Sequence, residues 1–367
     1  MSVKYSTEPE VVAPDAPFPG RKVLRAWLMP LCTKTTLMPV FLLILDYSLF
    51  FLFIGLSVWV SSFLLKIVFG IMAGFVIGRL FILGHDACHQ SFTPYRRLNR
   101  ILGRIAFLPS LTPYSLWDIG HNLVHHGQTN LKGFDFVWAP LSLEEYHNLP
   151  LWRQKLERIY RSGWLPGLYY FIEMWWLRMY FPKKTYMGAK RSEFFWDGVL
   201  VTVFGVIWAT VLVWLALATE QSVFEILLSA GIVPFVLWNF MIGFVVYAHH
   251  THTSVSWYDN KVEWTAAQPY VSTTVHLMFR FQIGRLMHHI MEHTAHHLDM
   301  SIPLYRLKEA QKFLEDHLPG RIVMQNFSWA WYFETAKKCK LYDFQKRCWL
   351  DFSGAQTSSP MVSEISR

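Results

Sequence analysis

The sequence has few charged residues and few cysteines for its length. Of its 367 residues, 16% are charged, compared with about 25% in typical soluble domains, whereas 53% are hydrophobic and 17% are aromatic. The apolar residues lie in long runs. This composition argues against a soluble protein of two domains and favours one integral membrane domain with polar segments attached to it.

The four cysteines, Cys32, Cys88, Cys339 and Cys348, show neither a paired metal-binding spacing nor the density of a disulfide scaffold. We expect reduced thiols in a cytosol-like compartment. Residues 1–20 are polar and contain no apolar core, so we expect no cleaved signal peptide. The formal charge of +8 comes from scattered Lys and Arg residues that flank apolar runs, which favours a membrane surface and an acidic protein partner over nucleic acid.

Four apolar segments are each about long enough to cross a bilayer, and they cover residues 37–62, 67–84, 198–218 and 223–248. The first contains one charge, Asp46, and the second contains Arg79 near its end, which we expect to snorkel toward the membrane surface. The predicted fold is all-α, with four transmembrane helices and a cytosolic helical cap. We divide the chain into a polar arm with an interfacial helix at 1–36, a membrane domain at 37–320 and a C-terminal segment with a polar tail at 321–367.

The segments between the spans are polar or amphipathic. Residues 101–116 are too short and too interrupted by proline to span, so we expect an interfacial or re-entrant segment. Residues 144–164, EEYHNLPLWRQKLERIYRSGW, are interpreted as one amphipathic surface helix. Residues 303–320, PLYRLKEAQKFLEDHLPG, predict a second such helix, which Pro319 and Gly320 end.

The number of spans predicts which segments share a membrane face. With four spans, residues 1–36, the segment between spans two and three, and the chain after residue 248 all lie on one side. That side carries 32 of the 34 Lys and Arg residues, all but Lys66 and Arg79. The positive-inside rule makes it cytoplasmic, in a bacterial inner membrane or an ER-type membrane.

Histidine is concentrated on this predicted face. Of 16 histidines, eight fall in three groups, and none lies inside a predicted span. The groups are His85 and His89 in HDACH, His121, His125 and His126 in HNLVHH, and His293, His296 and His297 in HTAHH. Imidazole binds iron, zinc, copper and nickel alike, but a single structural zinc needs only four ligands, so two metals fit better. A membrane haem would have its axial histidines within the spans, and a metal transporter would need more ionisable residues there than Asp46 and Arg79.

Helix geometry brings most of these histidines together within each group. His85 and His89 are four residues apart, on one face of a helix that would continue the second span. On a helix over 288–297, His296 and His297 each project within about 60° of His293. His126 diverges from His121 by about 140° on a regular helix, so either the helix distorts there or one histidine of this group is not a ligand.

The ordered set HDACH, HNLVHH and HTAHH, with two spans between the second and third motifs, resembles the membrane fatty acid desaturase superfamily. Residues 250–264 and 293–305, HTHTSVSWYDNKVEW and HTAHHLDMSIPLY, are similar to the plant and cyanobacterial acyl-lipid desaturases that add a second double bond. The resemblance covers roughly residues 37–320. It implies an oxygen-dependent oxidoreductase with two non-haem iron ions, which dehydrogenates an acyl chain bound to a lipid or a carrier.

The resemblance also implies the metal ligands, which are the eight histidines of the three groups and one more near the end of the fourth span. We choose His250 for this place, with His252 second; in a competing interpretation His288 or His289 fills it. Ligating imidazoles usually donate their other N–H to a carboxylate or a carbonyl. Four acidic residues adjacent to the histidine groups are candidates for this role: Asp86, Asp118, Glu292 and Asp299.

The sequence departs from the family pattern in two places. Gln90 follows His89 where many relatives that add a double bond have a second histidine, and three residues rather than two separate His121 from His125. These departures keep open a related di-iron hydroxylase, acetylenase or ketolase acting on an acyl, alkane or carotenoid substrate. No fused cytochrome b5 is recognised, so the resemblance implies a separate electron donor of the ferredoxin or cytochrome b5 type.

Overall fold

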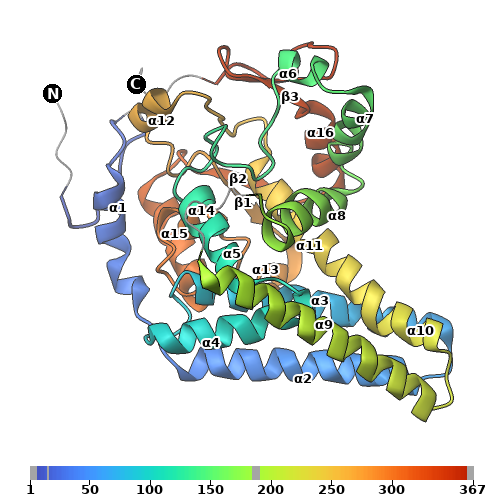
Figure 1. Ribbon diagram of the computed structural model, residues 1–367. Coiled ribbons are helices and arrows are strands. Elements are labelled where there is room, and N and C mark those ends of the chain that lie inside the picture. Colours follow the sequence, from blue (N-terminus) through green and yellow to red (C-terminus); the bar gives the residue numbers. More distant parts are fainter. Residues whose placement is uncertain (1–5, 15, 184–190, 362–367) are drawn as a thin grey trace. The chain divides into compact units, whose positions relative to one another are not determined.

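The computed structural model describes residues 6–14, 16–183 and 191–361 (Figure 1). The chain forms two compact units, each made of several chain segments. The unit that we call the membrane unit consists of Lys34–Asn122 and Gly167–Phe244. The unit that we call the polar unit consists of Met1–Thr33, Leu123–Pro166 and Val245–Arg367.

The membrane unit contains helices that are long and apolar enough to cross a bilayer, which confirms the prediction of four spans. They are α2 (Leu37–Trp59), α3 (Phe63–Cys88), α9 (Ser192–Ala218) and the continuous helix Val223–His250, composed of α10 (Val223–Leu227), the π-helical turn η6 (Leu228–Ile232) and α11 (Val233–His250). Helix α3 starts earlier and ends later than predicted, so His85 lies in its last turn and His89 caps it. The last residues of α11, from Val245, belong to the polar unit.

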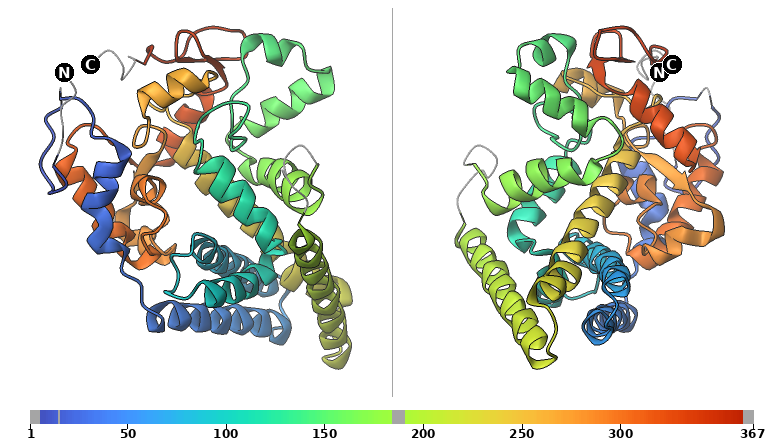
Figure 2. Two further views of the ribbon diagram at one scale, coloured as in Figure 1. Left: turned by 60° about the vertical axis from the view of Figure 1, so that its left-hand side comes forward. Right: turned by 90° about the vertical axis from the view of Figure 1, so that its right-hand side faces the viewer.

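Helices α2 and α3 lie side by side as a hairpin (Figure 2). On its other side α3 contacts the fourth span through Gly70, Gly74 and Gly78, which recur every four residues. A Cβ atom at Gly70 would lie 2.1 Å from the carbonyl oxygen of Ser229, and one at Gly74 would lie 2.8 Å from that of Pro234. Small residues at this spacing allow helix backbones to approach closely in a membrane, where no hydrophobic effect drives helices together.

The two charges inside the first two spans form an ion pair, which corrects the prediction that Arg79 snorkels to the membrane surface. An Nη atom of Arg79 lies 2.6 Å from a carboxylate oxygen of Asp46, and both residues are buried. A charge facing lipid carries a large desolvation cost, so charged residues within spans usually face the bundle interior and pair there. Hydropathy alone did not reveal that the two residues face each other.

The remainder of the membrane unit consists of shorter helices. Residues 101–116 fall in α4 (Arg96–Phe107), the 3-10 turn η2 (Leu108–Ser110) and α5 (Tyr114–Asp118), and η4 (Tyr170–Tyr180) is π-helical and follows α8 (Pro166–Tyr169). Asp197 of α9 connects α4 and α5, because its carboxylate accepts a hydrogen bond from Arg104 at 2.7 Å and from the backbone N–H of Ser115 at 2.9 Å.

The polar unit contains short helices and two small sheets, so the prediction of an all-α fold was incomplete. Strand β1 (Val275–Met278) pairs in parallel with β2 (Val323–Asn326), and β3 (Leu341–Asp343) pairs antiparallel with β4 (Cys348–Leu350). The helices are α1 (Arg21–Leu28), η1 (Met29–Cys32), α6 (Leu143–His147), α7 (Leu151–Tyr160), α12 (Lys261–Ala267), η7 (Arg280–Gln282), α13 (Ile283–Leu286), α14 (His293–Leu298), η8 (Leu304–Arg306), α15 (Leu307–His317) and α16 (Trp329–Lys338).

Two predictions for the polar unit have different outcomes. The surface helix expected at 144–164 is wrong, because α6 and α7 are separate helices. The break falls at Pro150, where the ring disfavours helical conformation of the preceding residue. The helix expected at 303–320 is confirmed as η8 followed by α15, which ends at His317 before Pro319. The four cysteines form no disulfide in the described part of the chain.

Candidate metal centre

Four buried histidines converge within the polar unit, and we call them the four-histidine cluster: His125, His250, His293 and His297. Each offers one ring nitrogen, and these nitrogens all lie within 4.8 Å of one another. The Nε2 atoms of His250 and His293 are 3.1 Å apart. His250 is the last residue of α11, and His293 and His297 are one turn apart in α14. The cluster thus combines side chains from three distant parts of the sequence.

Hydrogen bonds outside the cluster orient three of its rings. The Nδ1 atom of His125 lies 3.1 Å from both carboxylate oxygens of Asp135, and that of His250 lies 3.3 Å from the carbonyl oxygen of Thr273. Because these partners accept, each Nδ1 carries the proton and each Nε2 keeps its lone pair.

The third oriented ring is that of His297, whose Nδ1 lies 3.2 Å from the hydroxyl oxygen of Thr129. That hydroxyl donates its own proton to the backbone carbonyl of His125 at 2.8 Å, so it accepts from His297. The Nε2 atom of His297 is buried and has no hydrogen-bond partner among the described residues. Its lone pair is therefore available to a cation.

The histidines of α14 are neutral at neutral pH. Burial, together with the neighbouring histidines, holds the pKa of His293 and of His297 well below the usual value, and burial lowers the pKa of His296 to about 3. Neutral imidazole is the form that binds metals. Converging buried lone pairs repel one another unless a cation lies between them, so the donor set fits a transition-metal ion.

A second group lies within the membrane unit. The Nε2 atom of His85 is 3.0 Å from that of His121 and 3.3 Å from that of His89. The ring of Trp117 stacks on His121 with centroids 4.1 Å apart, and its edge meets the ring of His85 at 5.2 Å. The motif HDACH, at the end of α3, thus presents both of its histidines to the first histidine of HNLVHH.

The remaining two predicted ligands, His126 and His296, form a pair in the polar unit. Their Nε2 atoms are 3.1 Å apart. The ring of His126 also stacks on His297, with centroids 4.1 Å apart and planes inclined by 24°. The structure therefore arranges all nine histidines predicted as ligands in three close groups, each of which lies within one unit.

The backbone departs from a regular helix at both of the histidine motifs discussed from the sequence, HNLVHH and residues 288–297. The helix around HNLVHH is distorted, because residues Ile119–His125 (η3) form a π-helix, in which hydrogen bonds connect residues five apart. The helix expected over 288–297 is shorter, because α14 begins at His293. His288 and His289 precede it in left-handed conformations, with φ of 49° and 60°, and a regular helix cannot contain them.

The other candidate histidines lie outside these groups. His252 has its Nε2 atom 3.4 Å from the side-chain oxygen of Gln325, and His289 has its Nδ1 atom 3.1 Å from Glu292. His288 is buried. His249, directly before His250, stacks on His293 with ring centroids 4.0 Å apart. Of the histidines near the end of the fourth span, His250 is the one that the structure places in the four-histidine cluster.

The carboxylates chosen from the sequence have partners of several kinds. Asp86 accepts a hydrogen bond from the hydroxyl of Ser91, Asp118 accepts one from the amide of Asn122, and Asp299 pairs with Arg25, whereas Glu292 lies against His289. Asp135, which sequence reasoning missed, contacts the predicted ligand His125. It lies ten residues beyond His125. The one signal for it in the sequence is that it is the first acidic residue after HNLVHH.

Comparison with known proteins gives the family to which this chain belongs. The model of the family described as fatty acid desaturase matches residues 57–329, about three quarters of the chain. The chain belongs to the fatty acid desaturase family. Its members are oxidoreductases, and with four helices able to span a membrane it is a membrane-bound fatty acid desaturase.

Several relatives share about a quarter of their aligned residues with this desaturase. It is 26% identical to the sn-1 oleoyl-lipid 12-desaturase of a Picosynechococcus species, over 74% of this chain and 75% of the relative. It is 27% identical to a chloroplastic omega-6 fatty acid desaturase of Spinacia oleracea, over 74% of this chain and 58% of the relative. It is 28% identical to an sn-1 acyl-lipid omega-3 desaturase (ferredoxin) of a Synechocystis species, over 74% of this chain and 73% of the relative.

Proposed function

We propose that this desaturase introduces a second double bond into a monounsaturated acyl chain carried by a membrane lipid. Two relatives are named as desaturases of lipid-bound acyl chains, which supports a lipid over a soluble carrier. The reaction removes two hydrogen atoms from adjacent methylenes and reduces dioxygen to two molecules of water, which requires two further electrons and two protons. A separate donor of the ferredoxin or cytochrome b5 type supplies the electrons; one relative is named for ferredoxin.

The proposed ligand set is the nine histidines of the three groups, which hold two iron ions. The four-histidine cluster, which lies within the polar unit, holds one of the two irons. His250 rather than His252 or His288 is the ninth ligand, because it is the one whose ring nitrogen joins the cluster. When bound, the two irons would supply the oxidising power, drawn from dioxygen, that an unactivated methylene demands.

The protein itself contributes orientation and protection. Asp135, Thr129 and the carbonyl of Thr273 fix the Nδ1 atoms of three ligands, so that their Nε2 atoms stay directed at one point. Burial of the cluster excludes bulk water from it. The proposed location of the histidine-bearing polar segments is the cytoplasmic side, which the distribution of Lys and Arg supports, and the acyl chain enters from the lipid phase.

The four-histidine cluster in a member of this family is the single observation that carries the proposal. The test is expression in a host whose membranes lack polyunsaturated lipids, followed by mass spectrometry of the lipid acyl chains. We expect a new diunsaturated chain in membrane lipids and none from a His293→Ala variant at matched expression. A hydroxylated, acetylenic or keto product in place of the new double bond would overturn the proposal.

A further inference from the structure

The last segment of the polar unit, residues 339–361, lies beyond the part of the chain that matches the family model. It follows α16 and contains the hairpin of β3 and β4. Its Trp349 is completely buried, although it lies close to the end of the chain. Burial of so large a side chain gives this segment a fixed position within the polar unit.

This segment contacts the irregular loop 251–258, which directly follows His250. The indole N–H of Trp349 donates a hydrogen bond to the carbonyl oxygen of His252 at 2.9 Å, and the hydroxyl of Tyr342 accepts one from the backbone N–H of Trp257 at 3.3 Å. Trp257 packs in one buried cluster with Cys339, Tyr342 and Trp349. The loop therefore depends on the C-terminal segment for both hydrogen bonds and packing.

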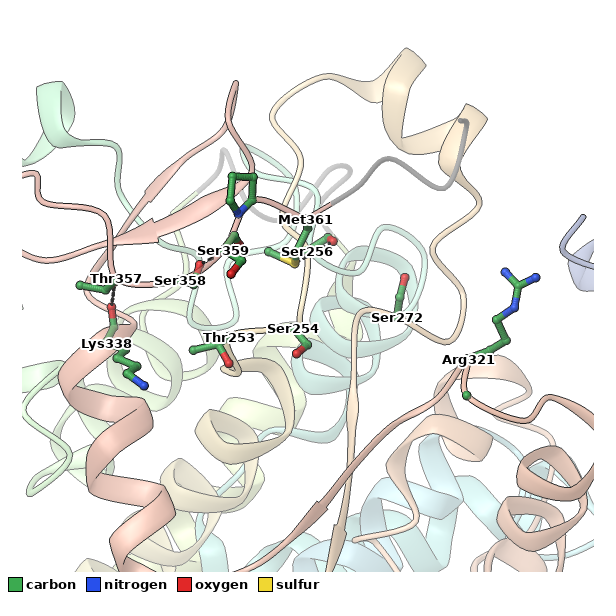
Figure 3. Close-up of a pocket in the computed structure, with 12 residues that line it drawn as sticks. Thr253, Ser254, Ser256, Ser272, Arg321, Lys338, Thr357, Ser358, Ser359 and Met361 are labelled. Atoms are coloured by element: carbon green, nitrogen blue, oxygen red, sulfur yellow. Dashed lines mark hydrogen bonds between the residues drawn. The ribbon is translucent and has the colours of Figure 1, made fainter. Parts of the chain in front are cut away.

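The same loop borders a polar hollow of about 520 Å³ (Figure 3). Thr253, Ser254 and Ser256 line it from the loop, and the C-terminal segment lines it with residues 357–361. Figure 3 shows Met361 beside Ser256, whose hydroxyl lies 3.2 Å from the Met361 sulfur. The end of the segment thus closes back onto the loop that follows His250.

The loop also contacts the chain that carries His125. The backbone N–H of Tyr258 donates to the carbonyl of Asn130 at 3.0 Å, and the side chain of Asn130 donates to the carbonyl of Ser256 at 2.9 Å. The backbone N–H of Asn130 in turn donates to Asp135 at 2.9 Å, and Asp135 binds His125. A continuous path of contacts therefore leads from Trp349 to two members of the four-histidine cluster, His250 and His125.

We infer that residues 339–361 are a brace that sets the geometry of the four-histidine cluster, with Trp349 as its principal positioning residue. The loop 251–258 has no regular structure of its own, so contacts from outside the loop fix it. Groups that support a metal ligand typically change metal affinity by about tenfold to a hundredfold when they are removed. The inference rests on one part of the proposed function, namely that the four-histidine cluster binds a metal.

The test compares iron retention in the full-length protein purified in detergent. Trp349→Phe keeps a buried ring but loses the indole N–H, and Tyr342→Phe removes only the hydroxyl. Trp329→Phe, on the exposed side of α16, is the matched control. Each protein is titrated with the Fe²⁺ chelator ferrozine, and the melting temperature of the metal-free form is measured as well. We expect Trp349→Phe to lose iron at a chelator concentration about tenfold lower than the wild type, with Tyr342→Phe in between.

The control and the metal-free melting temperatures separate positioning from folding. The inference holds if the metal-free variants have the same melting temperature as the wild type while the chelator concentration that removes half of the iron, which we call the midpoint, is lower for the variants. Unchanged midpoints in both variants overturn it, and so does a midpoint that falls only together with the metal-free melting temperature. If the wild type itself retains no iron, the proposed function fails instead, so the two failures are distinguishable.

Discussion

Both carboxylate oxygens of Asp135 lie 3.1 Å from the Nδ1 atom of His125. Asp135 is buried and also accepts hydrogen bonds from the backbone N–H groups of Asn130 and Val137, at 2.9 and 3.0 Å. These donors hold the carboxylate in place, and the carboxylate in turn keeps the proton of His125 on Nδ1. An outer partner held in this way fixes the orientation of the ring and directs its other nitrogen toward the cluster.

Asp135→Asn tests this relationship. The amide preserves the size of the side chain but removes the charge, so we expect metal affinity to fall about tenfold to a hundredfold. The affinity is measured by competition with an Fe²⁺ chelator. Asp316→Asn, an exposed carboxylate that pairs with Lys312, is the control and should leave the affinity unchanged. Equal affinities for the Asp135 and Asp316 variants would show that His125 needs no charged partner.

His250→Ala tests the ninth ligand. Because its Nε2 atom is 3.1 Å from that of His293, we expect this variant to lose iron and desaturase activity together. His147→Ala, at an exposed position of α6, should keep both. Iron content by elemental analysis and the yield of the new acyl chain are the two readouts. Full iron content and turnover in His250→Ala would move the ninth ligand elsewhere, and His288 would become the leading candidate.

The ion pair between Asp46 and Arg79 predicts the stability of single and double variants. Removing one partner leaves an uncompensated buried charge, so Arg79→Met alone should lower the free energy of unfolding by about 3–5 kcal/mol. The double variant Asp46→Leu with Arg79→Met should recover much of this loss because no charge remains. Denaturant titration in detergent micelles provides the measurement. A double variant as unstable as the single one contradicts the pairing.

The glycine row of α3 makes a prediction about packing between the spans. Gly70→Ala should prevent the close approach of α3 to the fourth span, since its Cβ would lie 2.1 Å from a backbone oxygen that cannot easily move. Gly55→Ala in α2 is the control, because a Cβ there meets no atom within 4 Å. That change should be neutral or stabilise by up to about 1 kcal/mol. Thermal unfolding in detergent distinguishes the two; similar melting temperatures would refute close packing at Gly70.

The features that the sequence predicted well depend on local patterns. Four spans follow from runs of apolar residues, and the spacing of HDACH identifies two histidines on one face of α3. The geometry of HNLVHH predicted a conflict between a regular helix and three ligands. The sequence did not show how this conflict is resolved, because the formation of a π-helix depends on how the flanking residues pack.

The features that the sequence did not predict depend on contacts between distant segments. The pairing of Asp46 with Arg79 requires the relative rotation of two helices, which hydropathy does not contain. Asp135 reaches His125 because the chain folds back over ten residues, whereas the acidic residues considered from the sequence were those directly beside the histidines. The strands of the polar unit have three or four residues each, too few to show an alternating pattern.

The order in which the ligands occur along the chain has a consequence for biogenesis. Of the four-histidine cluster, only His125 precedes the third span, and His250 is the last residue of the fourth. His293 and His297 follow more than forty residues later. A nascent chain therefore cannot present this cluster until all four spans have been made, so a metal ion held by all four histidines, as proposed, would bind late, after all four spans have been synthesised.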